Sequence, residues 1–150
     1  MIWLDLEGTI IDDLTNRNWL NKNINDIVNQ DDTFGIFTWG WFSADEIDIE
    51  LIKLIEKKLK MKFAHKVITK LDCMAFEHNH KWFWSGDIEK DFEAECSFNE
   101  KFTKEACFID MFKHSDGSIN ILFDDSIEDT KVITFLDTGN IIKLVKVGND

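Results

Sequence analysis

The chain has 150 residues, of which 29 are acidic and 17 basic, and its net charge is −12. This length suits one domain that buries roughly two-thirds of its unfolded surface, and 44 % apolar residues argue against disorder. The negative charge opposes binding to long nucleic acids, and no apolar run approaches the roughly 20 residues of a membrane span.

Cysteine usage and composition favour a cytoplasmic protein. Cys73, Cys96 and Cys107 cannot all pair and show no CxxC spacing, so we expect free thiols in a reducing compartment. No secretion-signal pattern opens the chain. Proline and tyrosine are absent while Asn, Lys and Ile abound, which is typical of an AT-rich genome such as that of a phage.

The first predicted elements alternate between strands and helices, as in a parallel sheet with helices on its faces. In chain order we expect a strand at Ile2–Leu4, a weak helix over 18–29, a strand at Thr33–Thr38, a helix over 43–59 and a strand at His65–Thr69. The helix over 43–59 is the clearest, because Ser43 and Glu46 match a capping box and apolar residues recur every four positions from Ile47 to Leu59.

In the second half of the chain, the predicted strand–helix alternation ends in an antiparallel hairpin. Residues 70–100 have no steady hydrophobic period. The later elements are a helix capped by Thr103 and stopped near Gly117, a strand at Ile119–Phe123, and a hairpin of Val132–Leu136 and Ile141–Val147 around Gly139-Asn140. We therefore expect a single α/β domain over 1–150, with a three-layer parallel sheet flanked by helices and a C-terminal antiparallel hairpin.

Polar groups end several predicted strands, and in a parallel sheet such ends meet at one edge. They are Asp5 and Glu7 after the first strand, Thr38 after the second, and Asp124, Asp125 and Asp129 after the fourth. Carboxylates gathered at one edge repel each other unless a divalent cation with oxygen ligands lies between them. We therefore expect a Mg²⁺ site completed by a substrate phosphate and a nearby lysine.

The acidic groups resemble two motifs of the haloacid dehalogenase-like (HAD-like) superfamily of phosphohydrolases. Its first motif, hhhDxDGT, is similar to IWLDLEGT at residues 2–9. Its fourth, an acidic pair followed by another acid, is similar to Asp124-Asp125 with Asp129. Together these two motifs are fairly specific, and the similarity spans roughly residues 2–136. Members of this family can carry a large cap, and residues 70–100 are too few for one, so the resemblance implies a lid-like loop there.

Two weaker motifs of that family complete the resemblance. A Thr or Ser ends its second strand, as Thr38 ends IFT here, and a lysine precedes its fourth strand. We assign that lysine to Lys104, with Lys101 and Lys70 as competitors. A lysine at a helix start is unfavourable for the helix dipole, which mildly favours a functional reason for Lys104.

The resemblance implies a Rossmann-like fold and a Mg²⁺-dependent phosphomonoester hydrolase. Asp5 would attack phosphorus and form an aspartyl-phosphate, and Glu7 would protonate the leaving group and then activate water. Thr38 and Lys104 would hold the phosphoryl oxygens. Mg²⁺ would be bound by Asp5, the Glu7 carbonyl and Asp125, with Asp124 or Asp129 beside it.

One position departs from the family, which has Asp where this chain has Glu7. The extra methylene moves the carboxyl by about 1.5 Å, against a catalytic tolerance of roughly 0.5 Å. Three consequences are open: the enzyme is slower, it acts on an altered substrate, or it has lost turnover and only binds its ligand.

Aromatic residues flank the predicted site, at Trp39 and Trp41 and again at Trp82 and Trp84. Tryptophans more often pack in a core, but near a phosphate site they can stack on a nucleobase, at about 1–3 kcal/mol per base. The expected substrate is a phosphorylated small molecule, with a nucleotide or a terminal phosphate of a nucleic acid as the specific hypothesis. His78 and His80 do not complete a zinc site and are expected in a solvated loop.

Two other functions are open. Exonucleases of the DEDD type also begin with a strand ending Asp-x-Glu, which would make Glu7 native, but their further acidic motifs have no convincing match here. The other alternative is a HAD-like protein that binds a phosphorylated ligand or a partner without turnover.

Overall fold

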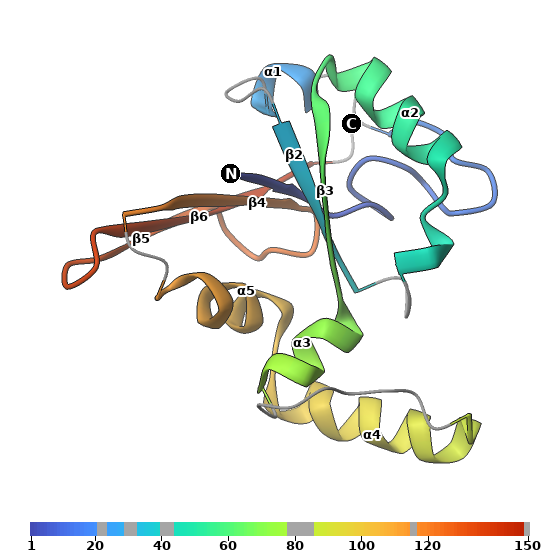
Figure 1. The fold of residues 1–150 in the computed structure, drawn as a ribbon, viewed down its shortest axis with the longest axis vertical. Coiled ribbons are helices and arrows are strands. Elements are labelled where there is room, and N and C mark those ends of the chain that lie inside the picture. The colour runs from blue at the N-terminus through green and yellow to red at the C-terminus, as the bar shows by residue number, and fades with distance from the viewer. Residues whose placement is uncertain (21–23, 29–32, 40–43, 78–85, 115–116, 149–150) are drawn as a thin grey trace.

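The computed structural model describes residues 1–20, 24–28, 33–39, 44–77, 86–114 and 117–148, which form an α/β fold around one six-stranded sheet (Figure 1). The strands are β1 (Ile2–Leu4), β2 (Thr33–Thr38), β3 (Lys62–Thr69), β4 (Ile119–Asp124), β5 (Lys131–Phe135) and β6 (Asn140–Lys146). The helices are α1 (Ile24–Val28), the 3₁₀ turn η1 (Ala44–Glu46), α2 (Ile49–Leu59), α3 (Lys70–Glu77), α4 (Ile88–Lys101) and α5 (Lys104–Phe112).

The sheet has the order β3-β2-β1-β4-β6-β5 and is parallel except for β5, which runs antiparallel to β6. The predicted parallel sheet and C-terminal hairpin are thus confirmed. The short strand β1 lies at the centre, and Leu4 pairs with Ile36 of β2 and with Phe123 of β4. The carboxyl ends of these three strands therefore reach the same edge of the sheet.

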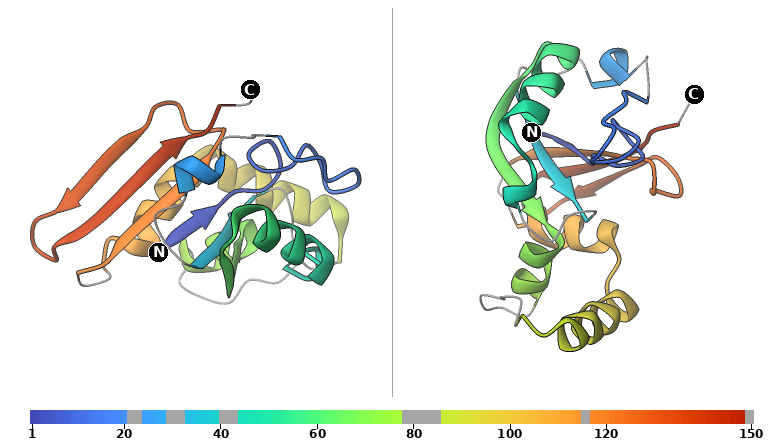
Figure 2. Two further views of the ribbon diagram at one scale, coloured as in Figure 1. Left: turned by 90° about the horizontal axis from the view of Figure 1, so that it is seen from above. Right: turned by 90° about the vertical axis from the view of Figure 1, so that its right-hand side faces the viewer.

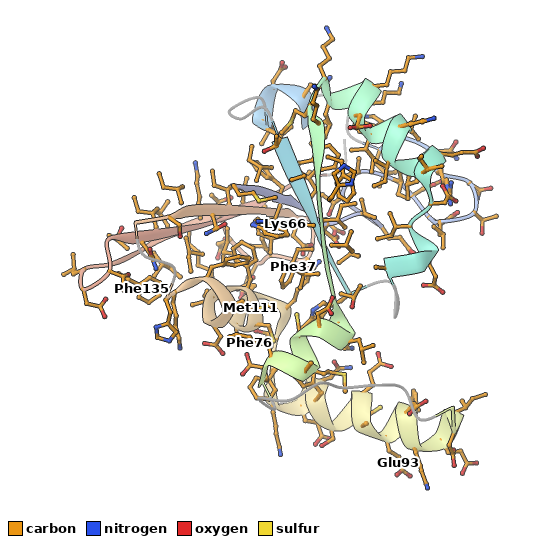
Figure 3. The ribbon with its side chains drawn as sticks, viewed as in Figure 1. Phe37, Lys66, Phe76, Glu93, Met111 and Phe135 are labelled. Atoms are coloured by element: carbon orange, nitrogen blue, oxygen red, sulfur yellow. The ribbon has the colours of Figure 1, made fainter. Side chains whose placement is uncertain are left out.

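Alternate residues of β1 point into two separate cores. Ile2 and Leu4 belong to the core under α1 and α2, whereas Trp3 belongs to the core that α3 and α5 cover on the other face. Figure 2 shows these two helical layers on opposite sides of the sheet. Figure 3 labels Phe37 of β2 and Met111 of α5, which both contribute to the core on the α5 face. The layered arrangement follows from strands that are apolar on both faces.

Helix α5 begins where the sequence predicts. The Thr103 hydroxyl accepts a hydrogen bond from the Ala106 amide at 3.1 Å, which caps the helix, and Cys107 and Phe108 bury its inner side. At its other end the helix stops at Phe112, before Gly117, and the Asn140 side chain donates to the Lys113 carbonyl at 2.7 Å.

Several predicted elements differ from the structure in their bounds. Helix α2 starts at Ile49 because Asp48, held by Arg17 at 2.6 Å, caps it through the Leu51 amide, and Ser43 lies outside the described residues. In the region 18–29 only α1 is helical among the residues described. The loop predicted over 70–100 is wrong, since α3 and α4 occupy most of it.

Helices α3 and α4 extend beyond the carboxyl end of β3, and α4 lies farthest from the sheet (Figures 1 and 2). In α4 only Phe98 is buried, which is why the segment shows no clear helical period. Among the described residues, no helix is both long and apolar enough to span a membrane.

Candidate functional site

Lys104 joins two carboxylates from separate strands at the carboxyl edge of the sheet. Its Nζ atom lies 2.7 Å from Asp5 Oδ1, just after β1, and 2.5 Å from Asp124 Oδ2, at the end of β4. Asp5 is 6 % exposed and Asp124 1 %. The ammonium therefore neutralises part of a buried negative charge that water cannot reach.

The start of α5 places this lysine. Lys104 is the first residue of the helix, directly after the Thr103 cap. Phe108, one turn later, packs edge-on against Phe37 of β2 with ring centroids 5.2 Å apart. The helix is thus anchored on the sheet, and the carboxylates offset the unfavourable position of a cation at a helix N-terminus.

Thr9 forms the second link across the site. The Thr9 and Ile10 amides donate to the Leu6 carbonyl at 3.1 and 2.9 Å, which folds the chain into a tight turn directly after β1. The Thr9 hydroxyl lies 2.9 Å from Asp5 Oδ2 and 3.0 Å from Asp125 Oδ1, and it accepts a hydrogen bond from the Asp125 amide at 2.9 Å. Its single proton can serve only one carboxylate at a time.

Gly8 is required by both conformation and space. Its φ is +82°, in the region that residues with a Cβ rarely adopt. A Cβ at this position would lie 2.6 Å from Asp125 Oδ2. The close approach of the turn to Asp125 therefore depends on glycine.

Asp5, Asp124 and Asp125 form a group able to hold a metal ion. Each offers a carboxylate oxygen, and these oxygens all lie within 4.8 Å of one another. Asp124 Oδ1 accepts from the Ser126 amide and hydroxyl at 2.9 and 2.8 Å. Asp124 Oδ2 faces the Lys104 ammonium at 2.5 Å. Three clustered carboxylates with one lysine between two of them keep a net negative charge, which fits a hard cation such as Mg²⁺.

The pKa values of Asp5 and Asp124 are shifted in opposite directions. Burial raises the pKa of Asp5 to about 6, and Asp124 adds to the rise, while Lys104 and Thr9 oppose it. Burial alone would raise the pKa of Asp124, but Lys104 and Ser126 lower it below its usual value. Lys104 itself has a raised pKa because Asp5 and Asp124 outweigh its burial, so it stays charged.

Glu7 and Asp129, two of the predicted metal ligands, are not part of the three-carboxylate group. Burial and the nearby charges of Asp13 and Glu46 raise the pKa of the Glu7 carboxyl. Asp129 is exposed, because the chain turns at Ser126 and buries Ile127, which leaves the following residues facing solvent.

The other predicted residues keep their places at or near the edge. Thr38 ends β2 and is fully buried beside Thr69 of β3. Of the candidate lysines, Lys104 contacts Asp5, whereas Lys70 is buried and pairs with Glu95 at 2.9 Å, and Lys101 is exposed at the end of α4. Thr9 is part of the motif at residues 2–9, but its role in linking Asp5 and Asp125 could not be predicted from the sequence.

Trp39, which directly follows β2, is engaged within the protein. The Lys70 ammonium lies 4.9 Å from the centroid of the Trp39 ring, and Phe98 packs against that ring at 5.7 Å. The Trp39 indole also donates to Cys73 Sγ at 3.4 Å. These contacts favour a packing role for Trp39. Trp41, Trp82 and Trp84, with His78 and His80, lie outside the described residues.

Replacing Gly8 by alanine is expected to cost more folding stability than the same change at Gly117. Gly117→Ala is the matched control, since its φ is also positive, at +66°, but no atom lies within 4 Å of the added Cβ. The left-handed backbone should lower the free energy of unfolding by about 1–2 kcal/mol in both variants. The clash with Asp125 should lower it by about 1–3 kcal/mol more in Gly8→Ala. Urea unfolding measures the difference, and equal losses in the two variants would contradict this account of Gly8.

The raised pKa of Asp5 predicts a pH-dependent stability in metal-free protein. Because the pKa of Asp5 is about 6 in the folded protein and 3.8 for an ordinary aspartate, the stability associated with protonated Asp5 is complete below pH 3.8 and lost as the pH rises through 6. Asp5→Asn cannot ionise at this position. Its thermal stability in EDTA should therefore increase relative to the wild type between about pH 4 and pH 7. A difference independent of pH would show that Asp5 titrates normally.

Comparison with known proteins gives no match. No protein-family model matches the chain, and neither does any curated protein or solved structure. Its function is therefore inferred from the contacts and the chemistry of the site.

Proposed function

We propose that the protein is a Mg²⁺-dependent phosphomonoester hydrolase that works through an aspartyl-phosphate on Asp5, as HAD-like phosphatases do. The observation that carries this proposal is the meeting of Lys104 with Asp5 and Asp124, beside Asp125, at the carboxyl edge of the sheet. A nucleophilic carboxylate, two further carboxylates for a cation, and a lysine for phosphoryl oxygens are the groups that such a reaction needs.

Asp5 would serve as the nucleophile. Lys104 and Thr9 hold its two carboxylate oxygens at 2.7 and 2.9 Å, so the side chain has one fixed orientation. One oxygen attacks phosphorus, a bond from Asp5 to phosphorus forms, and the bond from phosphorus to the leaving alcohol breaks. Water then attacks the same phosphorus, which releases inorganic phosphate and restores Asp5.

Asp5, Asp124 and Asp125 would hold Mg²⁺, with the backbone carbonyl of Glu7 as a further ligand. The bound ion supplies charge neutralisation for the phosphate and for the carboxylates around it. Lys104 would then exchange its contact with Asp5 for the phosphoryl oxygens, because its charge is no longer needed between the two carboxylates.

Glu7 would move the protons. A general acid must be protonated when substrate binds, and the raised pKa of Glu7 favours that state. It would donate its proton to the leaving alcohol and accept one from the attacking water in the second step. The side chain is partly exposed and free of the three-carboxylate group, which suits a group that must reach toward the substrate.

The surroundings of Glu7 favour a small monoester over a polyphosphate. Asp13 and Glu46 add negative charge beside Glu7, and with the net charge of −12 they repel substrates that carry several phosphates. The packing of Trp39 gives no support to nucleobase stacking at this residue.

Two alternatives have less support. A DEDD-type exonuclease needs four acidic ligands for two metal ions, and the described residues bring three carboxylates together with a lysine between two of them. A binding protein without turnover would keep the same site, and only an assay separates it from a hydrolase.

Asp5→Asn should abolish Mg²⁺-dependent hydrolysis of p-nitrophenyl phosphate, with a loss of at least about a thousandfold, because the nucleophile is gone. Asp26→Asn is the control, since Asp26 lies exposed on α1 and undergoes the same chemical change. Each variant is also assayed on single-stranded DNA. Nuclease activity alone, or no activity in the wild type with either substrate, would contradict the proposal.

Glu7→Gln should lower turnover by about a hundredfold or more, because an amide cannot donate a proton to the leaving alcohol. Glu7→Asp retains the acid and should keep much more activity than Glu7→Gln. A poor leaving group, such as a sugar phosphate, should show a larger loss than p-nitrophenyl phosphate, which needs little protonation. Equal losses in both variants on both substrates would exclude an acid–base role for Glu7.

A further inference from the structure

The loop that follows β4 carries Asp125, and a lysine on the neighbouring strand holds its backbone. Lys146, at the end of β6, donates from Nζ to the Asp125 carbonyl at 3.1 Å and to the Ile127 carbonyl at 2.8 Å. The register explains this reach, since Lys146 pairs with Asp124 at the carboxyl ends of two parallel strands. The Lys146 amide also donates to the Thr130 hydroxyl at 3.0 Å, where the loop returns toward β5.

From these contacts we infer that Lys146 is a positioning residue that sets the affinity of the site for Mg²⁺ through the backbone of Asp125. The inference rests on the proposed function, since it assumes that Asp125 is a metal ligand. It goes beyond that function because, among the contacts described, the Lys146 side chain binds backbone carbonyls and none of the three carboxylates.

Asp125 is held at both ends of its backbone. The Thr9 hydroxyl accepts from its amide and lies 3.0 Å from its carboxylate, and the Lys146 ammonium donates to its carbonyl. With both ends of the residue fixed, the carboxylate is directed toward Asp5 and Asp124. Without Lys146, the carbonyls of Asp125 and Ile127 would lose their shared donor, and the loop could turn its carboxylate away.

Two effects of removing Lys146 oppose each other. Loss of a positive charge near the carboxylates should strengthen cation binding, but Lys146 is exposed and its charge is screened, so this gain is no more than a few-fold. Loss of an interaction that orients a metal ligand weakens binding by about tenfold to a hundredfold. The second effect should win, so the sign of the change separates positioning from simple charge.

The test is a calorimetric titration of the full chain with Mg²⁺ alone, supported by the Mg²⁺ concentration at which the thermal midpoint rises. Lys146→Met keeps the apolar stem and removes the donor, and it should weaken Mg²⁺ binding at least about tenfold. Lys146→Arg keeps two donors and should stay within a few-fold of the wild type. Lys143→Met is the control, because it removes the same charge from the same strand, where Lys143 pairs with Val132 of β5.

Circular dichroism checks that each variant is folded, and Lys146→Gln replaces Lys146→Met if the latter does not fold. Unchanged or tighter Mg²⁺ binding in Lys146→Met would overturn the inference and leave the proposed function standing. Equal weakening in Lys143→Met would also overturn it, since the loss would not depend on contact with the loop. If the wild type binds no Mg²⁺, the inference and the proposed function fail together.

Discussion

The ion pairs of Lys104 with Asp5 and Asp124 are the interaction on which the site depends. Two carboxylates buried side by side without a cation would be strongly destabilising. Lys104 offsets this repulsion, because its Nζ lies within 2.7 Å of both groups. The cap at Thr103, the packing of Phe108 and the central position of β1 all serve to bring these three charges to one point.

The remaining contacts convert this charged cluster into a site of defined geometry. Thr9 and Gly8 place a tight turn against Asp125, and Ser126 fixes Asp124 from the opposite direction. The result is a set of carboxylates whose orientation is fixed before any ligand binds. Such preorganisation is what phosphoryl transfer demands, because positioning and charge stabilisation supply most of its catalysis.

Much of the fold could be predicted from the sequence, because the strands are apolar on both faces and Thr103 is a clear helix cap. The grouping of Asp5 with Asp124 and Asp125 followed from the rule that parallel strands end at one edge. Helix α4 could not be predicted, since only Phe98 is buried and the helix has little apolar face. Asp129 was misplaced because spacing alone does not reveal that Ile127 turns inward, and no local signal points to Lys146.

The most direct test of the account is a crystal structure after a Mn²⁺ soak, with Mn²⁺ as a stand-in for Mg²⁺ that is visible by anomalous scattering. We expect a single anomalous peak about 2.0–2.3 Å from carboxylate oxygens of Asp5 and of Asp124 or Asp125. A structure in which the three carboxylates bind no metal would contradict the proposed chemistry.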